Sequence, residues 1–247
     1  MALWRPVAAP TPMPDPTNPP LTVEQIEALR GLDACTLANA IETFHQRLRN
    51  EGFVDQTVRC LFRRLPPMVG YAATVKIRGS APPTADANYP ERTDWWDYVV
   101  SLPAPRVVVI QDVSSYLGRG SLVGALYMNI LRALHCVGVV TDGSVRDLLA
   151  AEGAGFHFFA RSVSLSHAYV HIIETGRPVE IGGLTIRSGD LLHGDAHGVQ
   201  SIPLNIAARV PPVAAKIAAR ERGLIELCQS PGFTLGKIRT AISEELL

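Results

Sequence analysis

The segment that begins "RVVVIQDV" and ends "GVVTDG" constrains the fold more than any other part of the chain. Both runs are apolar and are typical of buried strands. Between them, leucine or isoleucine recurs at every fourth position from Leu122 to Leu134, including Leu126, which predicts a helix with one broad apolar face. Strand, helix and strand in this order predict a right-handed βαβ unit with two parallel strands.

The predicted start of that helix offers hydrogen-bond donors. Gly120 and Gly124 bracket it, and the first turn spans Gly124, Ala125, Leu126 and Tyr127. Backbone amides of a first helical turn lack intrahelical partners and lie at the positive end of the helix dipole. We therefore expect these amides to bind a small anion.

Arg146 and Asp147 follow the second strand, in the opening turn of the next predicted helix. Ligands of open α/β sheets bind in the crevice at the carboxyl ends of the strands, so the pair is expected to face the helix start. A guanidinium grips a carboxylate with forked donors, and a carboxylate holds a hard cation. The alternative is a solvated ion pair in which Asp147 only stabilises a helix N-terminus.

Helices are predicted on both sides of this centre. Thr22, with Gln25 three residues later, predicts a capped helix that Gly31 ends, and Asp33 opens a second one. "VGYAATVKIRG" is predicted to be a strand, and the proline-rich "PPTADANYPERTDWWDYVVSLPAP" a loop with one helical turn. The last forty residues, which begin "PPVAAKIAARERGLIELC", predict an amphipathic terminal helix.

Two glycine-rich segments predict antiparallel strand pairs in the C-terminal half. "VEIGGLTI" is a hairpin that turns at Gly182 and Gly183, and "GDLLHGDAHGVQSIPL" is a second strand pair. His193, Asp195 and His197 alternate in the latter, so on an extended segment they would share one face. That spacing allows a metal or acid-base site, and the alternative is a polar turn between two strands.

Other titratable residues give weaker signals. Lys76 lies on a predicted strand, and no visible neighbour lowers its pKa for Schiff-base chemistry, so strand alternation explains it. His167 and His171 are interpreted as interface or surface residues.

Composition limits the partners and the compartment. Lysine plus arginine and aspartate plus glutamate both total 23, so the chain lacks the charge excess that draws proteins to nucleic acids or anionic membranes, and a small-molecule partner is expected. No run approaches the roughly 18 apolar residues of a membrane span, and the four cysteines form no CxxC pair, so we expect a cytoplasmic protein. Residues 1–20, with seven prolines, are expected to be a disordered arm, and residues 21–247 a single domain.

Several motifs in this order resemble the RraA-like family, which contains the ribonuclease E activity regulator and the metal-dependent 4-hydroxy-4-methyl-2-oxoglutarate aldolases. They are "LDACTLANAIE", "GVVTDGSVRD", "GFHFFAR" and "VEIGGLTIRSGDLLHGDAHGVQSIP". The resemblance runs from about Leu21 to the C-terminal helix. It implies a compact α/β/β/α sandwich with helices at both termini, assembled as a homotrimer or hexamer with the site between subunits.

For the aldolase members, the resemblance implies a class II lyase in which Mg²⁺ or Mn²⁺, held largely through water, binds pyruvate and stabilises its enolate. Carried onto this chain, Asp147 would hold the metal, and Arg146 would grip the substrate carboxylate or the developing oxyanion. The amides from Gly124 to Tyr127 would receive the pyruvyl carboxylate. Secondary candidates around the site are Asp142, Asp195, His197 and, from a neighbouring subunit's C-terminal helix, Glu221.

One position departs from the family pattern. Family aldolases carry an acidic residue at the helix start, separated from the arginine by twenty residues, and this chain has Ala125 there. Two functions therefore stay open. The favoured one is a metal-dependent lyase, an aldolase or decarboxylase of a small 2-oxo or hydroxy di- or tricarboxylic acid. The other is a non-catalytic binding protein that regulates a ribonuclease or another protein partner.

Overall fold

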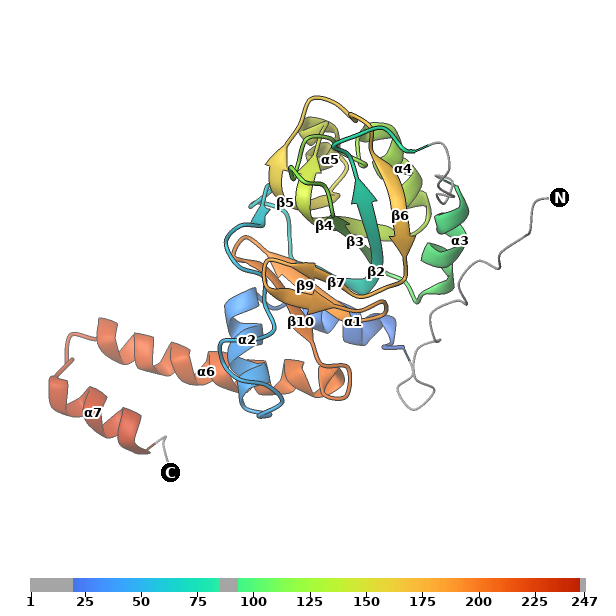
Figure 1. The fold of residues 1–247 in the computed structure, drawn as a ribbon. Coiled ribbons are helices and arrows are strands. Elements are labelled where there is room, and N and C mark those ends of the chain that lie inside the picture. Colours follow the sequence, from blue (N-terminus) through green and yellow to red (C-terminus); the bar gives the residue numbers. More distant parts are fainter. Residues whose placement is uncertain (1–19, 85–92, 245–247) are drawn as a thin grey trace.

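The computed structural model describes residues 20–84 and 93–244. Figure 1 shows four layers: helices, a parallel sheet, a second layer of antiparallel strands, and further helices. This arrangement confirms the predicted α/β/β/α sandwich with helices at both ends of the described chain. The expected arm lies outside the described residues except for Pro20.

Four parallel strands form the centre of the molecule, and they lie side by side in the order in which they occur in the chain. They are β2 (Met68–Arg78), β3 (Arg106–Asp112), β4 (Cys136–Val145) and β5 (His157–Val163). Within the described residues, each connection contains one helix: α3 (Asp94–Ser101), α4 (Ala125–Ala133) or α5 (Leu148–Gly153). The predicted βαβ unit is therefore confirmed as the middle one of three successive units.

The two faces of this sheet bury different cores. Val108 and Ile110 of β3 pack in the cluster under α3, α4 and α5, whereas Val107 and Val109 pack in the cluster on the opposite face. All four side chains are fully or almost fully buried. A continuous apolar run is the sequence pattern expected of a strand that is covered on both faces.

Antiparallel strands cover the second face. β9 (Leu191–Asp195) and β6 (His171–Thr175) pair with the two halves of β2, and β10 (Gly198–Ile202) pairs with β9. The short strand β1 (Arg59–Cys60) pairs with β5, and β7 (Val179–Ile181) and β8 (Leu184–Ile186) form a separate hairpin. Leu192, Val199 and Ile181 share one buried cluster with β3, so the sheet curls over its own face and is nearly closed.

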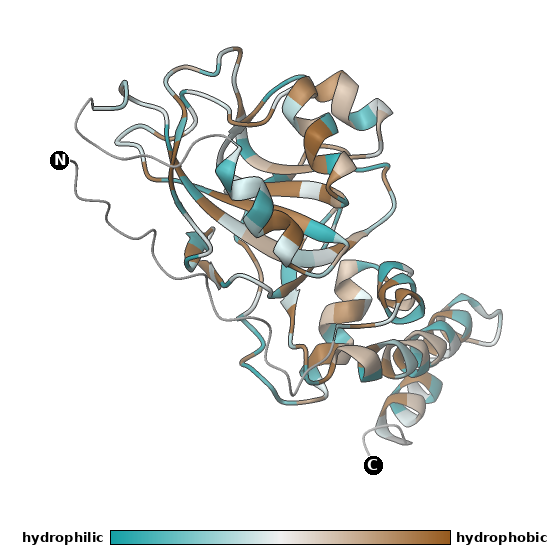
Figure 2. Ribbon diagram, turned by 90° about the vertical axis from the view of Figure 1, so that its right-hand side faces the viewer, coloured by the Kyte–Doolittle hydropathy of each residue, from teal (hydrophilic) through white to brown (hydrophobic). Residues whose placement is uncertain are grey.

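A third core lies between β9, β10 and the outer helices α1 (Val23–Arg30), α2 (Ala34–Glu42) and α6 (Val210–Gln229), which the 3₁₀ turn Ala207–Arg209 precedes. The predicted helix starts are confirmed: Thr22 and Gln25 form a capping box, and the Asp33 side chain accepts from the Thr36 amide. In Figure 2 the strands are largely brown, and the outer helices carry teal on their free sides.

Four sequence predictions were wrong in detail. The proline-rich segment contains an eight-residue helix, α3, that buries Trp95, although residues 85–92 lie outside the described ranges. Strand β6 was not predicted. The C-terminal region forms two helices, α6 and α7 (Leu235–Glu244). Helix α4 begins only at Ala125 and buries Met128 and Leu131, whereas Leu126 is 78% exposed.

Within the described residues, no helix is both long enough and apolar enough to span a bilayer.

Candidate functional site

The candidate site lies where β4 ends beside the first turn of α4. The chain segment that leads into α4 joins β4 through an isolated parallel bridge between Ser121 and Ser144. The hydroxyl of Ser144 donates to the Gly120 carbonyl at 3.0 Å, and the Arg146 amide donates to the Val123 carbonyl at 3.3 Å. These contacts fix the residues after β4 against the start of α4.

Asp147 caps α4 from a distance in the sequence. Helix α4 starts after Gly124, which has no side chain to cap it, and Asp147 supplies the acceptor: the Ala125 amide donates to its Oδ2 at 2.7 Å. Asp147 itself has a left-handed backbone (φ 57°, ψ 46°), an uncommon conformation for a residue with a side chain. The expectation that the Arg146–Asp147 pair faces this helix start is confirmed.

Gly124 makes this approach possible. A Cβ atom built at Gly124 would lie 2.7 Å from Oδ2 of Asp147 and 3.2 Å from Cγ of Arg146. Any side chain at this position would push the carboxylate away from the Ala125 amide. The glycine therefore allows the close packing of Arg146 and Asp147 against the helix start.

The charges of the pair are only partly satisfied by each other. Arg146 Nε lies 3.5 Å from Oδ1 of Asp147, an ion pair without hydrogen-bond geometry, and this buried nitrogen has no other hydrogen-bond partner in the described part of the chain. The Ala125 amide, followed by the positive charge of Arg146, lowers the pKa of the Asp147 carboxyl, and His167 adds to the effect. Asp147 is therefore an anion at neutral pH, with Oδ1 bound by no backbone donor.

The rest of the first turn of α4 is open on one side and packed on the other. Leu126 is exposed beside the site, whereas Tyr127 is half-buried, stacks on Trp95 and accepts a hydrogen bond from the indole nitrogen of that residue. The structure thus holds the first turn through Tyr127 and leaves the outer side accessible.

A second carboxylate lies at the same edge of the sheet. Asp142 Oδ1 accepts from the Asp112 amide at 2.8 Å, while the Asp112 carboxylate accepts from the amides of Ser114 and Gly118. Burial, reinforced by the Asp112 charge, raises the pKa of Asp142 to about 6. Asp142 therefore braces the loop after β3.

His167 lies at the site, although the sequence indicated only an interface or surface residue. Its Nδ1 is 2.6 Å from the carbonyl oxygen of Ser121, three residues before Gly124. His167 also contributes, as the weakest of the named causes, to the lowered pKa of Asp147. No local pattern could have shown this, because the contact spans 46 positions of the sequence.

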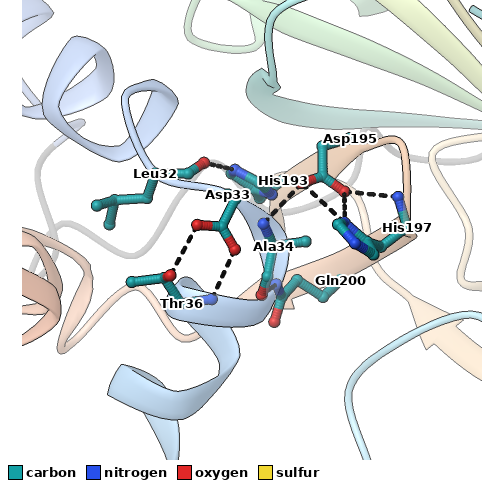
Figure 3. A network of polar contacts seen from close by, with 8 residues as sticks. All are labelled: Leu32, Asp33, Ala34, Thr36, His193, Asp195, His197 and Gln200. Atoms are coloured by element: carbon teal, nitrogen blue, oxygen red, sulfur yellow. Dashed lines mark hydrogen bonds and ion pairs between the residues drawn. The ribbon is translucent and has the colours of Figure 1, made fainter. Parts of the chain in front are cut away.

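The alternating residues of β9 belong to a different network, drawn in Figure 3. Asp195 accepts from the Ala34 amide at 2.8 Å and from the His197 amide at 2.8 Å, and His193 Nε2 lies 2.9 Å from the Leu32 carbonyl oxygen. These partners come from the start of α2 and from the β9–β10 turn. The structure therefore shows the polar turn between two strands, and the contacts of Asp195 and His197 are not with α4 or the end of β4.

Two further candidates have partners elsewhere. Glu221 of α6 is exposed, and its Oε1 lies 3.5 Å from Asn39 of α2, so it does not contribute to the site of its own chain. Lys76 donates to Glu174 of β6 at 2.9 Å, so its amine is engaged in an ion pair with the neighbouring strand.

The donors of the site suit only one kind of metal. In the described ranges, no group of three or more His, Cys, Asp or Glu side chains converges on a point that could hold an ion. A zinc site with a full set of protein ligands is therefore not formed by these residues. Mg²⁺ and Mn²⁺ accept one carboxylate and keep waters or substrate oxygens as their other ligands, which fits the free Oδ1 of Asp147.

Known proteins resemble this chain in both sequence and structure. A protein of Halalkalibacterium halodurans named "Putative 4-hydroxy-4-methyl-2-oxoglutarate aldolase" is 30% identical over 126 residues, which cover 49% of this chain and 60% of that protein. An uncharacterised Pseudomonas syringae protein superposes with a TM-score of 0.69 at 22% identity, covering 95% of this chain and 99% of the other.

A Streptomyces coelicolor protein, described as an unusual member of the RNase ES inhibitor RraA protein family, superposes with a TM-score of 0.64 at 18% identity, covering 82% of this chain and 96% of the other. These structural likenesses show the fold. The family model "RraA-like: Aldolase/RraA" matches residues 34–200, which is more than half of the chain and includes the whole βαβ unit with Gly124, Arg146 and Asp147. The chain therefore belongs to the RraA-like family.

Proposed function

We propose that this protein is a divalent-metal-dependent lyase that cleaves or decarboxylates a small 2-oxo or hydroxy di- or tricarboxylic acid by way of a pyruvate enolate. One observation carries the proposal: Asp147 bonds to the first amide of α4 through Oδ2, while its Oδ1 and the Arg146 guanidinium stay available at the same place. The named aldolase relative supports it, although the aligned part covers only 60% of that protein.

Each residue of the pair has a distinct task in this proposal. Asp147 would hold Mg²⁺ or Mn²⁺, and the cation would supply Lewis-acid polarisation of the 2-oxo group. Arg146 binds a substrate carboxylate, because its forked donors match two carboxylate oxygens. The Ala125 amide is already bound to Asp147, so the amides that follow it in the first turn of α4, those of Leu126 and Tyr127, would orient the pyruvyl carboxylate at the positive helix end.

Because Ala125 cannot transfer a proton, another group must do so, or the reaction must not need that transfer. The family acid is absent at this position, so its proton-transfer role requires another group or a reaction that does not need it. A retro-aldol cleavage needs a base for the hydroxyl proton, whereas decarboxylation needs only a proton donor for the enolate carbon. Decarboxylation is therefore the less demanding of the two reactions here.

We also propose that the active form is a homotrimer or hexamer. Helix α6 buries only Val210 and Ala214, and its second half projects away from the sheet together with α7 (Figure 1). Exposed apolar side chains on this region are available for a second subunit: Ile225, Phe233, Leu235 and Ile242. In such an assembly Glu221 would reach a neighbouring site, and light scattering at micromolar protein concentration tests it, because a monomer contradicts the idea.

The test of the function is metal-dependent turnover. Purified protein is incubated with oxaloacetate and with 4-hydroxy-4-methyl-2-oxoglutarate, and pyruvate is measured. EDTA should abolish pyruvate release, and added Mg²⁺ or Mn²⁺ should restore it. Full turnover in the metal-free protein contradicts the mechanism, and Ala125→Asp should raise aldol cleavage if the missing acid limits the rate.

Ala125 specifically favours the second candidate function, a non-catalytic protein that binds a ribonuclease or another partner. Under that proposal Arg146→Lys and Asp147→Asn leave partner binding unchanged, because binding depends on surface residues outside the site. No cleavage of any 2-oxo acid by the wild type with metal present, and none gained by Ala125→Asp, would select it.

A further inference from the structure

We propose that His167 is the catalytic acid-base residue of this site and exchanges a proton with the substrate through Nε2. The proposal rests on the proposed function, and it names the group that takes over the work of the missing acid at Ala125. Three features support the proposal: the contacts that fix the His167 loop, the ring nitrogen that is hydrogen-bonded, and the position of the imidazole ring.

The loop that carries His167 is fixed to the segment entering α4. Ser121 donates its amide to the Ser166 carbonyl at 3.1 Å and accepts from the His167 ring through its own carbonyl at 2.6 Å. A Cβ at Gly120 would collide with the His167 carbonyl oxygen, so the two segments are in van der Waals contact. Ala168 follows with φ 45°, a strained turn that the surrounding contacts hold in place.

The bound nitrogen determines the tautomer of the ring. A carbonyl oxygen only accepts hydrogen bonds, so the Nδ1 of His167 carries a proton and donates it to Ser121. In the neutral imidazole, Nε2 then has the free lone pair and is the basic atom. The Ser121 carbonyl thus fixes the orientation of the ring and leaves Nε2 as the nitrogen that can exchange a proton.

The position of the ring matches the need of the site. Ser121 lies three residues before Gly124, and the imidazole lies close enough to Asp147 to affect its carboxylate electrostatically. His167 is half-buried, so part of the residue is open to solvent. An imidazole is therefore bound to the segment that leads into α4, the helix in which the family carboxylate is absent.

The proton transfer balances without any further reactant. In aldol cleavage, Nε2 takes the proton of the C4 hydroxyl while the C3–C4 bond breaks. The electron pair of that bond becomes the C2–C3 double bond of the enolate. The imidazolium then returns the proton to C3, which gives pyruvate and restores the neutral ring. In decarboxylation a protonated ring serves only the last step, the delivery of a proton to the enolate carbon.

The test is hydrogen–deuterium exchange at the pyruvate methyl group in D₂O with Mg²⁺, followed by proton NMR. This exchange needs the base and the enolate but no carbon–carbon cleavage. His167→Asn is the informative variant, because the asparagine amide retains the donor to the Ser121 carbonyl and lacks the basic Nε2. We expect it to keep the fold and pyruvate binding and to lose exchange by about 100-fold or more.

Two further variants complete the experiment. Ala125→Asp in the His167→Asn background should recover part of the exchange, since it returns an acid-base group to the first turn. His171→Asn is the matched control, because the Nδ1 of His171 also lies within hydrogen-bond distance of a backbone carbonyl, that of Tyr169 at 2.8 Å, and its exchange rate should equal that of the wild type.

The outcomes separate the two proposals. If the wild type exchanges the methyl protons and His167→Asn exchanges them equally fast, the role of His167 is refuted while the lyase proposal stands. The role is also refuted if His167→Asn loses pyruvate binding, measured by equilibrium dialysis, since the residue then positions the loop. If the wild type shows neither exchange nor cleavage, the lyase proposal fails, and with it the role of His167.

Discussion

Asp147 and Asp195 make the same hydrogen bond in two different places, and the comparison shows what makes one of them a candidate for chemistry. Each accepts from the first amide of a helix that is distant in sequence: Ala125 of α4 at 2.7 Å and Ala34 of α2 at 2.8 Å. Their surroundings differ, since the Asp195 side chain is 8% exposed and the Asp147 side chain 36%.

The second oxygen decides between the two roles. Oδ1 of Asp195 accepts from the His197 amide and lies beside the His197 ring (Figure 3). Both carboxylate oxygens of Asp195 are therefore bound within the protein. Helix α2 also has its own cap in Asp33. Among the described residues, Oδ1 of Asp147 lies 3.5 Å from Nε of Arg146 and accepts from no backbone N–H. A capping carboxylate has a structural role when both of its oxygens accept hydrogen bonds within the protein. It is a candidate ligand-binding group when one oxygen accepts none.

The largest expected effect is on activity and comes from Asp147→Asn. The amide oxygen can still accept from Ala125, so the free energy of unfolding should fall by only about 0.3–1 kcal/mol, the usual value of a charge at a helix end. A neutral oxygen holds a hard cation poorly, so kcat/KM for 2-oxo acid turnover should fall by about 100-fold or more. Unchanged kcat/KM in Asp147→Asn would place Asp147 with the structural caps.

The next effect is on stability and comes from Asp195→Asn. Both Asp195 oxygens accept from N–H donors, so one amide N–H of the asparagine must face another donor in a buried site. We expect the free energy of unfolding in urea to fall by about 2–3 kcal/mol. Activity per folded molecule should stay at the wild-type value, and a loss of activity without destabilisation would contradict the distinction between the two aspartates.

A smaller effect should follow from Gly124→Ala. The added Cβ would lie 2.7 Å from Oδ2 of Asp147, so the carboxylate must move off the Ala125 amide. We expect turnover to fall by about 10-fold, which corresponds to roughly 1.4 kcal/mol. Gly153→Ala is the control, because its Cβ meets nothing within 4 Å and alanine favours helix α5. Equal turnover in both variants would show that the carboxylate tolerates displacement.

The smallest effect is a difference in acid sensitivity between the two helix starts. Burial lowers the pKa of His193, so as pH falls below about 6.5 the unfolded chain takes up a proton that the folded chain does not, and stability is lost. The Asp147 pKa is also lowered, but for a carboxyl this contribution is present above about 3.8 and is lost only below it.

From pH 7 to 5.5, amide hydrogen exchange corrected for its intrinsic rate should therefore increase at the start of α2 before it increases at the start of α4. The expected change at α2 is about 1 kcal/mol, with an upper limit of about 1.4 kcal/mol per pH unit for one histidine. Equal acceleration at both helix starts would show that the His193 network does not act locally.

The sequence predicted those parts of the molecule that depend on local patterns. Apolar runs predicted β2, β3 and β4, because strands that are covered on both faces are apolar over most of their length. The parallel βαβ geometry then placed Arg146 and Asp147 at the start of α4, which the hydrogen bond to Ala125 confirms. The capping residues predicted the starts of α1 and α2, because a capping hydrogen bond joins residues only three positions apart in the sequence.

The remaining features depend on contacts between distant segments. The fourfold leucine spacing failed as an indicator of the buried face of α4, because Leu122 is buried ahead of the helix and Leu126 points outward. Helix α3 forms around Trp95, whose burial against Tyr127 no local pattern indicates. His167 reaches the site only through the Ser121 carbonyl, so its neighbours in the sequence gave no sign of it.

The double pairing of β2 has a consequence during synthesis. One edge of this strand is completed by β9 along Met68–Tyr71 and by β6 along Val75–Arg78. Both partners are translated long after β2, and roughly 110 residues separate its end from β9, on the order of ten seconds of translation. The nascent chain carries an apolar strand with an unpaired edge for that time, which is the state that recruits chaperones or aggregates.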